Sequence, residues 1–567
     1  MNQVKLFTHQ ILSFINRNKG IFAFLITVLI VLIINSLHFS YPDEFESVMG
    51  GYFINHGILP YTGFFAHHVP FAYFYASIIT LFSGASFVAF RPLLAISYFL
   101  LIILFYVYIK KRFGNKESTI FLVFSGLIAI TGTYVWGQML LADSLVGYLL
   151  TPVYITILLI CLKKDLFTLK DVALISILSA FSLLTSVTFS YAILIIYLFT
   201  IFLYFVVQKR KIISFETIKF FAILAIPYII FSAYLLITRS FNDFYYQAIF
   251  FTKEYYLTMP DGSPVHNPLR YAVVLFYNFM DKYRVALVLV KDLNFGNPFA
   301  PALALSNLVL LVYLLINRKF KELLFVAGLL VYLNGRSNPL TTGETDYQAI
   351  PYQYFSLFNG IFVITLIWND LKNRVEDNKK IIYAFFLLLL GLYFSFLTFF
   401  LFNKFSEKAY LKYMGTQSMI YDRPAVANVI NSLISKDDYY YIGPFAFEDL
   451  LYTKGKLASK YIVTIPAMDK AEKIQQELIA DIQKNKPRFI VFDTEYYIFG
   501  KQPGVFLLNY LHKEYVNLEQ LKGEGLKYEF KQKFYGNYDF ERHFFFDKNQ
   551  KDSIINELVS KGLLTIK

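Results

Sequence analysis

The 567-residue chain contains a single cysteine, Cys161, which falls within an apolar run. Disulfide frameworks, cysteine-rich zinc clusters and a thiol nucleophile therefore have almost no support. Charged residues are also scarce, at 16% of the chain, whereas hydrophobic residues make up 56% and aromatic residues 19%. A soluble protein of this length could not bury so much apolar surface in its own cores, so the composition predicts a membrane protein.

Long apolar segments recur as far as residue 402, and a helix needs about 20 apolar residues to cross the hydrocarbon of a bilayer. The first segment follows a basic tail, but no small-residue cleavage site comes after it, so we interpret it as an uncleaved span. We predict about eleven transmembrane helices, at residues 21–39, 91–109, 118–136, 143–162, 171–187, 190–207, 216–237, 299–316, 322–334, 350–368 and 381–402.

Basic residues set the predicted orientation, because cytoplasmic loops of membrane proteins carry an excess of Lys and Arg. With these spans the cytoplasmic side receives the basic clusters at residues 5–19, 110–116, 163–170, 209–219, 318–321 and 372–380. A further span at 69–90 would move every cluster but the first to the other face, so we predict an interfacial or re-entrant helix there. The N-terminus is expected in the cytoplasm and the protein in the plasma membrane. The net charge of +13 then reflects orientation in the lipid bilayer and predicts no nucleic-acid partner.

From Asn403 onward the pattern changes to short β-type runs that alternate with helical runs, at residues 439–442 and 488–492 for strands and at 469–483 and 505–511 for helices. This alternation predicts a small α/β domain, which an odd number of spans places outside the cytoplasm. The expected protein is an α-helical polytopic membrane protein with a transmembrane domain at 1–402 and an extracytoplasmic α/β domain at 403–567.

The stretch from Ser40 to Phe90 contains no Lys or Arg, but it gathers acids and imidazoles just past the first span: Asp43, Glu44, Glu46, His56, His67 and His68. Residues 43–56 predict a helix that begins with the acids. Acids in a first turn suit the helix dipole without any function. A carboxylate at the hydrocarbon boundary, however, can be partly desolvated and become a better base. We favour a catalytic role for Asp43 and, after it, for Glu44.

His67 and His68 are adjacent imidazoles that precede Pro70. With nearby carboxylates they could ligate a divalent metal or contact an anionic phosphate, whereas histidine at a membrane interface can also be merely amphipathic. Adjacent histidines lack the i, i+4 spacing that chelates a metal from one helix face. Phosphate contact is therefore the favoured interpretation, and the metal alternative has His67, His68 and Asp43 as its candidate ligands.

Other polar groups lie at the predicted outer ends of later spans. Asp143 opens an otherwise apolar span, where an acid is a candidate functional residue, although a helix N-cap would explain it equally well. Arg336 and Tyr347 belong to a late outer loop. An arginine there could hold a phosphate through two hydrogen bonds, and the alternative is an interfacial anchor within an aromatic belt.

The chain resembles the GT-C class of membrane glycosyltransferases, in particular the branch that contains protein O-mannosyltransferases and the lipid A aminoarabinose transferase. The resemblance rests on motifs that follow one another over most of residues 20–400: Pro42-Asp43-Glu44, Gly57 to Tyr61, His67-His68-Val69-Pro70, Asp143 and Tyr347 to Pro351. It implies a sugar donor carried on a polyprenyl phosphate and an acceptor hydroxyl deprotonated by Asp43. The branch often has an acid near the position of His67 and a second proline at Val69, so metal use and phosphate recognition stay open.

The favoured hypothesis is thus an inverting glycosyltransferase that moves a sugar from a polyprenyl-phosphate donor to the hydroxyl of a protein, lipid or glycan acceptor at the outer interface. The alternative is a secondary transporter, or a flippase or ligase for lipid-linked glycans, because intramembrane acids also serve as proton relays. Repeated halves, which are usual in transporters, are not found in the sequence. A membrane scaffold that only presents the C-terminal domain would have no use for the acids.

Overall fold

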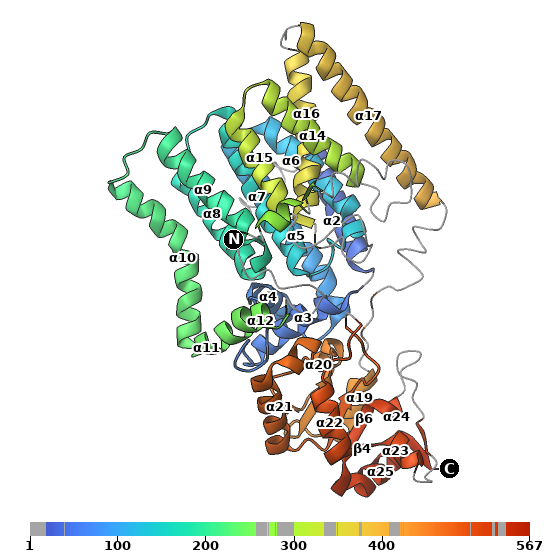
Figure 1. Ribbon diagram of the computed structural model, residues 1–567. Coiled ribbons are helices and arrows are strands. Elements are labelled where there is room, and N and C mark those ends of the chain that lie inside the picture. The colour runs from blue at the N-terminus through green and yellow to red at the C-terminus, as the bar shows by residue number, and fades with distance from the viewer. Residues whose placement is uncertain are drawn as a thin grey trace, which may run out of the picture. The chain divides into compact units, whose positions relative to one another are not determined.

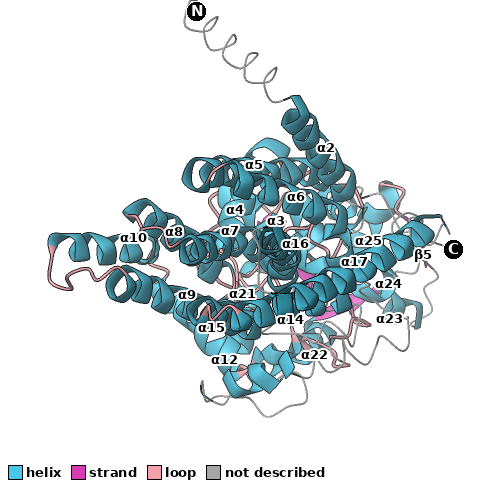
Figure 2. Cartoon of the chain, turned by 90° about the horizontal axis from the view of Figure 1, so that it is seen from above, coloured by secondary structure: helices cyan, strands magenta, loops and turns pink. Residues whose placement is uncertain are grey.

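The computed structural model is mostly helical (Figures 1 and 2). It describes residues 19–38, 40–256, 272–277, 300–333, 350–372, 377–406, 425–498, 500–523 and 540–566, together with a few isolated residues and one short strand between these ranges. Packing divides the chain into two compact units, each built from three segments. The first unit holds residues 1–40, 88–228 and 269–420, and the second holds residues 41–87, 229–268 and 421–567.

Each predicted span coincides with a helix to within a few residues. The helices are α2 (Lys19–Ser36), α5 (Phe87–Phe113), α6 (Asn115–Thr131), α7 (Ala142–Lys163), α8 (Leu169–Thr185), α9 (Ser190–Ile201) continued by η3 (Phe202–Val207), α10 (Phe215–Ile237), α14 (Ala300–Ile316), α15 (Phe320–Tyr332), α16 (Ile350–Lys372) and α17 (Asp377–Ser406). Within the described residues, six stretches are long and apolar enough to cross a membrane: α2, α5, α7, Val187–Val207, α10 and α16. The predicted polytopic helical fold is confirmed.

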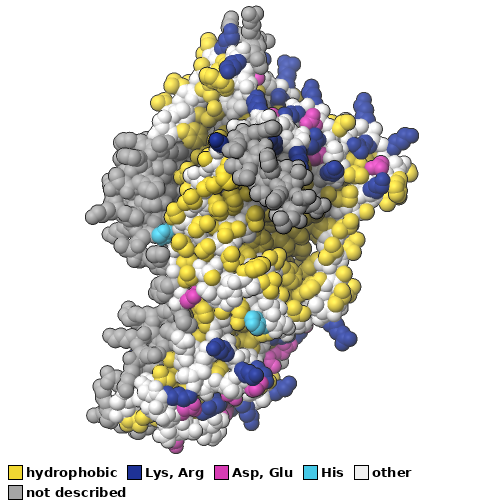
Figure 3. Space-filling model, turned by 180° about the vertical axis from the view of Figure 1, so that it is seen from behind, with side chains coloured by type: hydrophobic (Ala, Val, Ile, Leu, Met, Phe, Trp, Pro, Cys, Tyr) yellow, Lys and Arg dark blue, Asp and Glu magenta, His cyan; other side chains and the backbone are white. Residues whose placement is uncertain are grey.

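Helices α7 and α16 form the buried centre of the first unit, since 89% and 78% of their apolar windows are buried, against 22% for α2. Gly147 permits the close approach of these two helices, because a Cβ there would lie 2.8 Å from Ile350 Cγ2. Hydrophobic side chains cover much of the helical surface (Figure 3), and many Lys and Arg side chains gather toward one end of the helices. A surface of this kind suits a lipid environment with basic loops on one side.

The second unit begins with two short helices that lie side by side, α3 (Pro42–Asn55) and α4 (Phe71–Ser83) (Figure 1). Helix α4 has 13 residues and is capped by Gly84, whose φ of 59° suits glycine. At about 1.5 Å per residue it spans roughly 20 Å, less than the approximately 30 Å of hydrocarbon that a crossing helix needs. Helix α15 also has 13 residues, so length alone does not separate α4 from the predicted spans. An interfacial or re-entrant helix at residues 69–90 stays a prediction.

Three further short elements of the second unit follow α10: α11 (Phe241–Phe244), the π-helix η4 (Tyr245–Phe251) and α12 (Thr252–Glu254). Residue Lys460 of the C-terminal region joins this group, because its ammonium lies 3.1 Å from Asp243 and its carbonyl accepts a hydrogen bond of 2.6 Å from Phe65 N–H. Segments that are far apart in the sequence therefore pack together around the loop between α3 and α4.

The C-terminal region folds as the predicted small α/β domain. Its main sheet has the order β2-β1-β3-β6-β4, with β1 (Tyr439–Gly443) parallel to β2 (Lys456–Leu457) and β3 (Phe489–Phe492), and with β6 (Phe544–Asp547) antiparallel to β3 and β4 (Tyr515–Asn517). A second, two-stranded sheet pairs β5 (Tyr528–Phe530) with β7 (Leu564–Ile566). The helices are α19 (Ala425–Leu433), α20 (Phe447–Tyr452), α21 (Glu472–Asn485), α22 (Val505–Glu514), α23 (Leu518–Gly523), α24 (Phe540–His543) and α25 (Lys551–Ser560).

The close packing of α3 on α4 gives a first testable prediction. A Cβ at Gly51 would lie 2.6 Å from the carbonyl carbon of Ala76 and from Ser77 N, so alanine there must push the backbone of α4 away. We expect Gly51→Ala to destabilise the protein by about 1–3 kcal/mol, as overpacking usually does. Gly391→Ala in α17 is the matched control, because a Cβ there meets no described atom within 4 Å. The measurement is the monodisperse fraction after heating in detergent, and equal losses for both variants would contradict the expectation.

Candidate functional site

Helix α3 places the predicted acids at its start. Pro42 occupies the first turn, where its missing N–H removes no helical hydrogen bond. Asp43 and Glu44 follow in the same turn, which suits the positive end of the helix dipole. Glu44 is fully buried and Asp43 is half-buried. The predicted helix is thus confirmed, and Asp43 combines partial desolvation with access from outside.

Glu46 lies one turn further along α3 and has a strongly perturbed carboxyl group. Glu46 is 6% exposed, and its Oε1 accepts a hydrogen bond of 2.6 Å from the hydroxyl of Tyr73 on α4. The other oxygen, Oε2, lies 3.8 Å from His68 Nε2. Burial raises the pKa of Glu46 to about 8; the hydrogen bond from Tyr73 opposes this shift and the negative charge of Asp43 adds to it.

The loop that carries His67 and His68 is held by side chains from other elements. Gln247 of η4 is fully buried, donates from Nε2 to the Tyr61 carbonyl at 2.8 Å and accepts at Oε1 from Ala66 N–H at 3.0 Å. The hydroxyl of Tyr61 donates to the His68 carbonyl at 2.9 Å, and the hydroxyl of Thr252 donates to the His67 carbonyl at 3.0 Å. These contacts fix the backbone at both imidazoles.

The structure brings Glu46, His67 and His68 together, since one ligand atom from each lies within 4.8 Å of the other two. Sequence reasoning counted Glu46 among the acids but did not choose it as a site residue. Its spacing was a usable signal, because Glu46 lies three residues after Asp43 and so on a neighbouring part of the helix surface. The sequence could not show that Tyr73 and the histidine loop pack against this part of α3.

Aromatic side chains of the C-terminal domain also lie near α3. Helix α20 packs on α3. Burial raises the pKa of Tyr496, and the negative charge of Asp43 adds to this shift. Tyr496 follows β3, and its half-buried ring lies parallel to that of Phe445 with an interplanar angle of 8° and a centroid distance of 6.2 Å. No sequence motif marked either aromatic residue, because loops that follow strands carry no periodic signal.

Of the other predicted site residues, Asp143 belongs to the first unit, whereas Asp43 belongs to the second. Asp143 is 1% exposed and lies in the first turn of α7, whose N-cap is Leu141, so the N-cap explanation of Asp143 is wrong. A shared site for Asp43 and Asp143 stays a prediction. Arg336 and Tyr347 lie outside the described residues.

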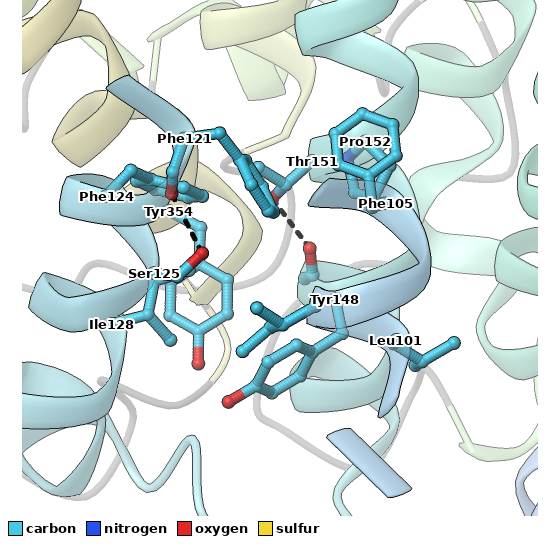
Figure 4. A pocket seen from close by; sticks show the side chains of 12 residues that line it. Leu101, Phe105, Phe121, Phe124, Ser125, Ile128, Tyr148, Thr151, Pro152 and Tyr354 are labelled. Atoms are coloured by element: carbon cyan, nitrogen blue, oxygen red, sulfur yellow. Dashed lines mark hydrogen bonds between the residues drawn. The ribbon is translucent and has the colours of Figure 1, made fainter. Parts of the chain in front are cut away.

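The first unit contains an apolar cavity between α5, α6, α7 and α16 (Figure 4). Its lining includes Phe105, Phe124, Tyr148, Pro152 and Tyr354. The volume is about 20 Å³, which is room for about one water molecule. A cavity of this size holds no sugar or lipid, so we do not assign it a substrate.

Comparison with known proteins gives a distant structural likeness. The chain is similar to the Archaeoglobus fulgidus oligosaccharyltransferase in its apo form, with 14% identity over 83% of this chain and 70% of that chain and a TM-score of 0.41. The complex of the same enzyme with Zn and sulfate is similar to this chain with 15% identity over 82% of this chain and 68% of that chain. The TM-score is 0.35. No protein-family model and no curated protein matches the sequence. At such low TM-scores and identities, the function has to be argued from the residues of this chain.

The glutamine that holds the histidine loop gives a second prediction. Gln247→Leu keeps a similar volume but leaves the Tyr61 carbonyl and the Ala66 N–H without this partner. Each buried backbone group that loses its hydrogen bond costs about 1–3 kcal/mol, so the protein should lose thermal stability and the loop its fixed geometry. Gln208→Leu, in the turn that follows η3, serves as the control for loss of an amide. Unchanged heat stability of the Gln247 variant in detergent would show that this glutamine does not hold the loop.

Proposed function

We propose that this chain is a GT-C-type glycosyltransferase, which moves a sugar from a polyprenyl-phosphate donor to an acceptor hydroxyl at the outer membrane interface. The observation that carries the proposal is that one compact unit holds both a half-buried acid, Asp43 at the start of α3, and the two imidazoles of a firmly held loop. Transfer from such a donor needs a base for the attacking hydroxyl and groups that stabilise charge on the phosphate.

In this proposal Asp43 is the general base, with Glu44 and Asp143 as further catalytic candidates. His67 and His68 are assigned to the phosphate, together with Arg336 and Tyr347 from the late outer loop. Polyprenyl phosphate is a stable leaving group, so the demand on the protein is charge stabilisation more than protonation. A divalent cation is part of the proposal as a group that would offset the phosphate charge beside these side chains.

The bilayer gives a physical reason for placing such a site next to apolar helices. The isoprenoid chain of the donor stays in hydrocarbon, whereas its sugar phosphate must reach water and the acceptor. We place the acid helix, the histidine loop and the extracytoplasmic domain from residue 403 onward on the outer face of the plasma membrane. We assign that domain a role in holding the acceptor, with the half-buried rings of Phe445 and Tyr496 as its candidate contact surface.

A single base that activates the acceptor for direct displacement inverts the anomeric centre. The NMR coupling constant of the product's anomeric proton tests this step. A product that retains the donor's configuration would show that a covalent or two-step mechanism operates instead.

The proposed activity is tested with purified protein in proteoliposomes that contain a panel of polyprenyl-phosphate-linked hexoses and pentoses and a membrane extract as the acceptor source. We expect cleavage of the sugar–phosphate bond, seen by mass spectrometry as free polyprenyl phosphate, and no consumption of nucleotide sugars. Movement of intact donor between leaflets without cleavage would indicate a flippase. Neither cleavage nor movement with any donor of the panel would overturn the proposal.

A further inference from the structure

The side chains of Glu46, His67 and His68 are arranged as an incomplete coordination shell. One ligand atom from each residue lies within 4.8 Å of the other two, and Glu46 Oε2 and His68 Nε2 are separated by 3.8 Å. Ligand atoms around a tetrahedral zinc ion lie about 3.4 Å apart, given metal–ligand distances of roughly 2.0–2.2 Å. Closing the shell therefore needs a movement of about 0.4 Å between Glu46 Oε2 and His68 Nε2, and of at most ~1.4 Å for any pair of ligand atoms.

We propose that Glu46, His67 and His68 bind one divalent transition-metal ion of the zinc class. Two imidazole nitrogens and one carboxylate oxygen form the donor set that zinc prefers in open sites, whereas magnesium and calcium take oxygen ligands. For its role in catalysis this ion rests on the proposed function, but its binding is measured without any transfer reaction.

Burial leaves one side of the site accessible. Glu46 and His67 are 6% and 5% exposed, whereas the side chain of His68 is 42% exposed. The two buried ligands fix the position of the ion, and the exposed histidine closes the shell from the solvent side. Three protein ligands leave a fourth position for water or a phosphate oxygen, as in metal sites that take part in chemistry.

The groups around the ligands already hold them in place. Tyr73 donates to Oε1 of Glu46, so Oε2 is the oxygen left to face His68. The carbonyls of His67 and His68 are bound by the hydroxyls of Thr252 and Tyr61, which fixes the backbone of both ligands. Such outer partners orient metal ligands, and their loss typically lowers metal affinity about 10–100-fold.

The three proposed ligands are not all close together in the sequence, so local spacing does not indicate the site. Adjacent histidines cannot chelate from one helix face, which made the metal the less favoured interpretation of the sequence alone. The third ligand comes from α3, more than twenty positions earlier, and α4 carries the tyrosine that orients it. The packing of α3 on α4 and the loop between them therefore supply what the local spacing lacks.

The test is the metal content of the full-length protein, purified in detergent on an affinity tag without histidine and incubated with Zn²⁺ or Mg²⁺ before desalting. We expect one zinc and no magnesium per chain by mass spectrometry. Cobalt substitution should give the visible absorption bands of a site with nitrogen and oxygen ligands. Glu46→Gln and His68→Ala should lose the metal, and Tyr73→Phe should weaken its affinity about 10–100-fold.

His56→Ala is the matched control, because His56 is an exposed histidine at the end of the same helix whose Nδ1 contacts the Tyr52 carbonyl. It should keep the metal. His68→Ala separates loss of the metal from misfolding. The ring of His68 is the exposed ligand, so its removal should leave the heat stability of the metal-free protein unchanged. Wild-type protein without zinc, or equal zinc in wild type and Glu46→Gln, would overturn the site. Transfer activity without bound metal would overturn this site alone, and bound metal without transfer would overturn the proposed function alone.

Discussion

Replacing Asp43 by Asn is expected to lower the rate of sugar transfer by about 10²- to 10⁴-fold, the usual contribution of a positioned general base. Asparagine keeps the size of the side chain and its place in the first turn of α3, but it cannot accept a proton from the acceptor hydroxyl. The fall should appear in kcat, because the amide still fills the space that the carboxylate occupied. Initial rates at saturating donor, with free polyprenyl phosphate as the readout, measure the effect.

Loss of a helix-start carboxylate could also act through the fold, so a matched control is needed. Glu117 lies in the first turn of α6, is half-buried as Asp43 is, and pairs with Lys163 at 2.9 Å. Glu117→Gln removes the same charge from the same place in a helix and should leave transfer within about twofold, since surface ion pairs contribute about 0–1 kcal/mol. If both variants lose activity equally, or if Asp43→Asn keeps the wild-type rate, Asp43 is not the base.

Local patterns in the sequence were enough to predict the long apolar helices, the two short helices that follow the first span, and two strands and two helices of the C-terminal domain. The apolar runs specify α2, α7 and α16 because a span must be continuous, and the short β-type runs specify β1 and β3. A Pro followed by two acids likewise specifies the start of α3. In each case the signal lies within about twenty residues, which is the range over which periodicity and capping act.

The environment of the candidate site could not be read in the same way, because it depends on packing between distant segments. Gln247, Thr252 and Tyr73 each contact the loop or α3 from another element, and each is an ordinary residue in its own stretch of sequence. The change of pattern at Asn403 marks where the predicted spans end. The second compact unit is instead assembled from 41–87, 229–268 and 421–567. Only tertiary contacts could reveal that grouping.

The second unit is built from three separate segments of the chain, and this restricts how many times the chain between them crosses the membrane. Segments that pack against one another must lie on the same side of the bilayer, so an even number of crossings must separate them. The N–H of Phe65 donates to the Lys460 carbonyl at 2.6 Å, and Gln247 binds the backbone of Tyr61 and Ala66. Between the loop and Gln247 the predicted spans are α5 to α10, and between the loop and Lys460 they also include α14 to α17. Both numbers are even if each helix crosses once.

A further crossing by α4 would make both numbers odd and would put a membrane between Phe65 and Lys460. In intact cells, an introduced cysteine on the outer side is therefore expected to be labelled and one on the cytoplasmic side is not. His56→Cys and Lys501→Cys should react with a membrane-impermeant maleimide, whereas Lys111→Cys, at the end of α5, should react only after the membrane is opened. All three positions are exposed, and the one native thiol, Cys161, is buried and provides the unlabelled background. Labelling of positions 56 and 501 from opposite sides would contradict the packing of the second unit. Labelling of both from the cytoplasm would keep that packing but exclude an extracytoplasmic acceptor, because Asp43 would then face the wrong compartment.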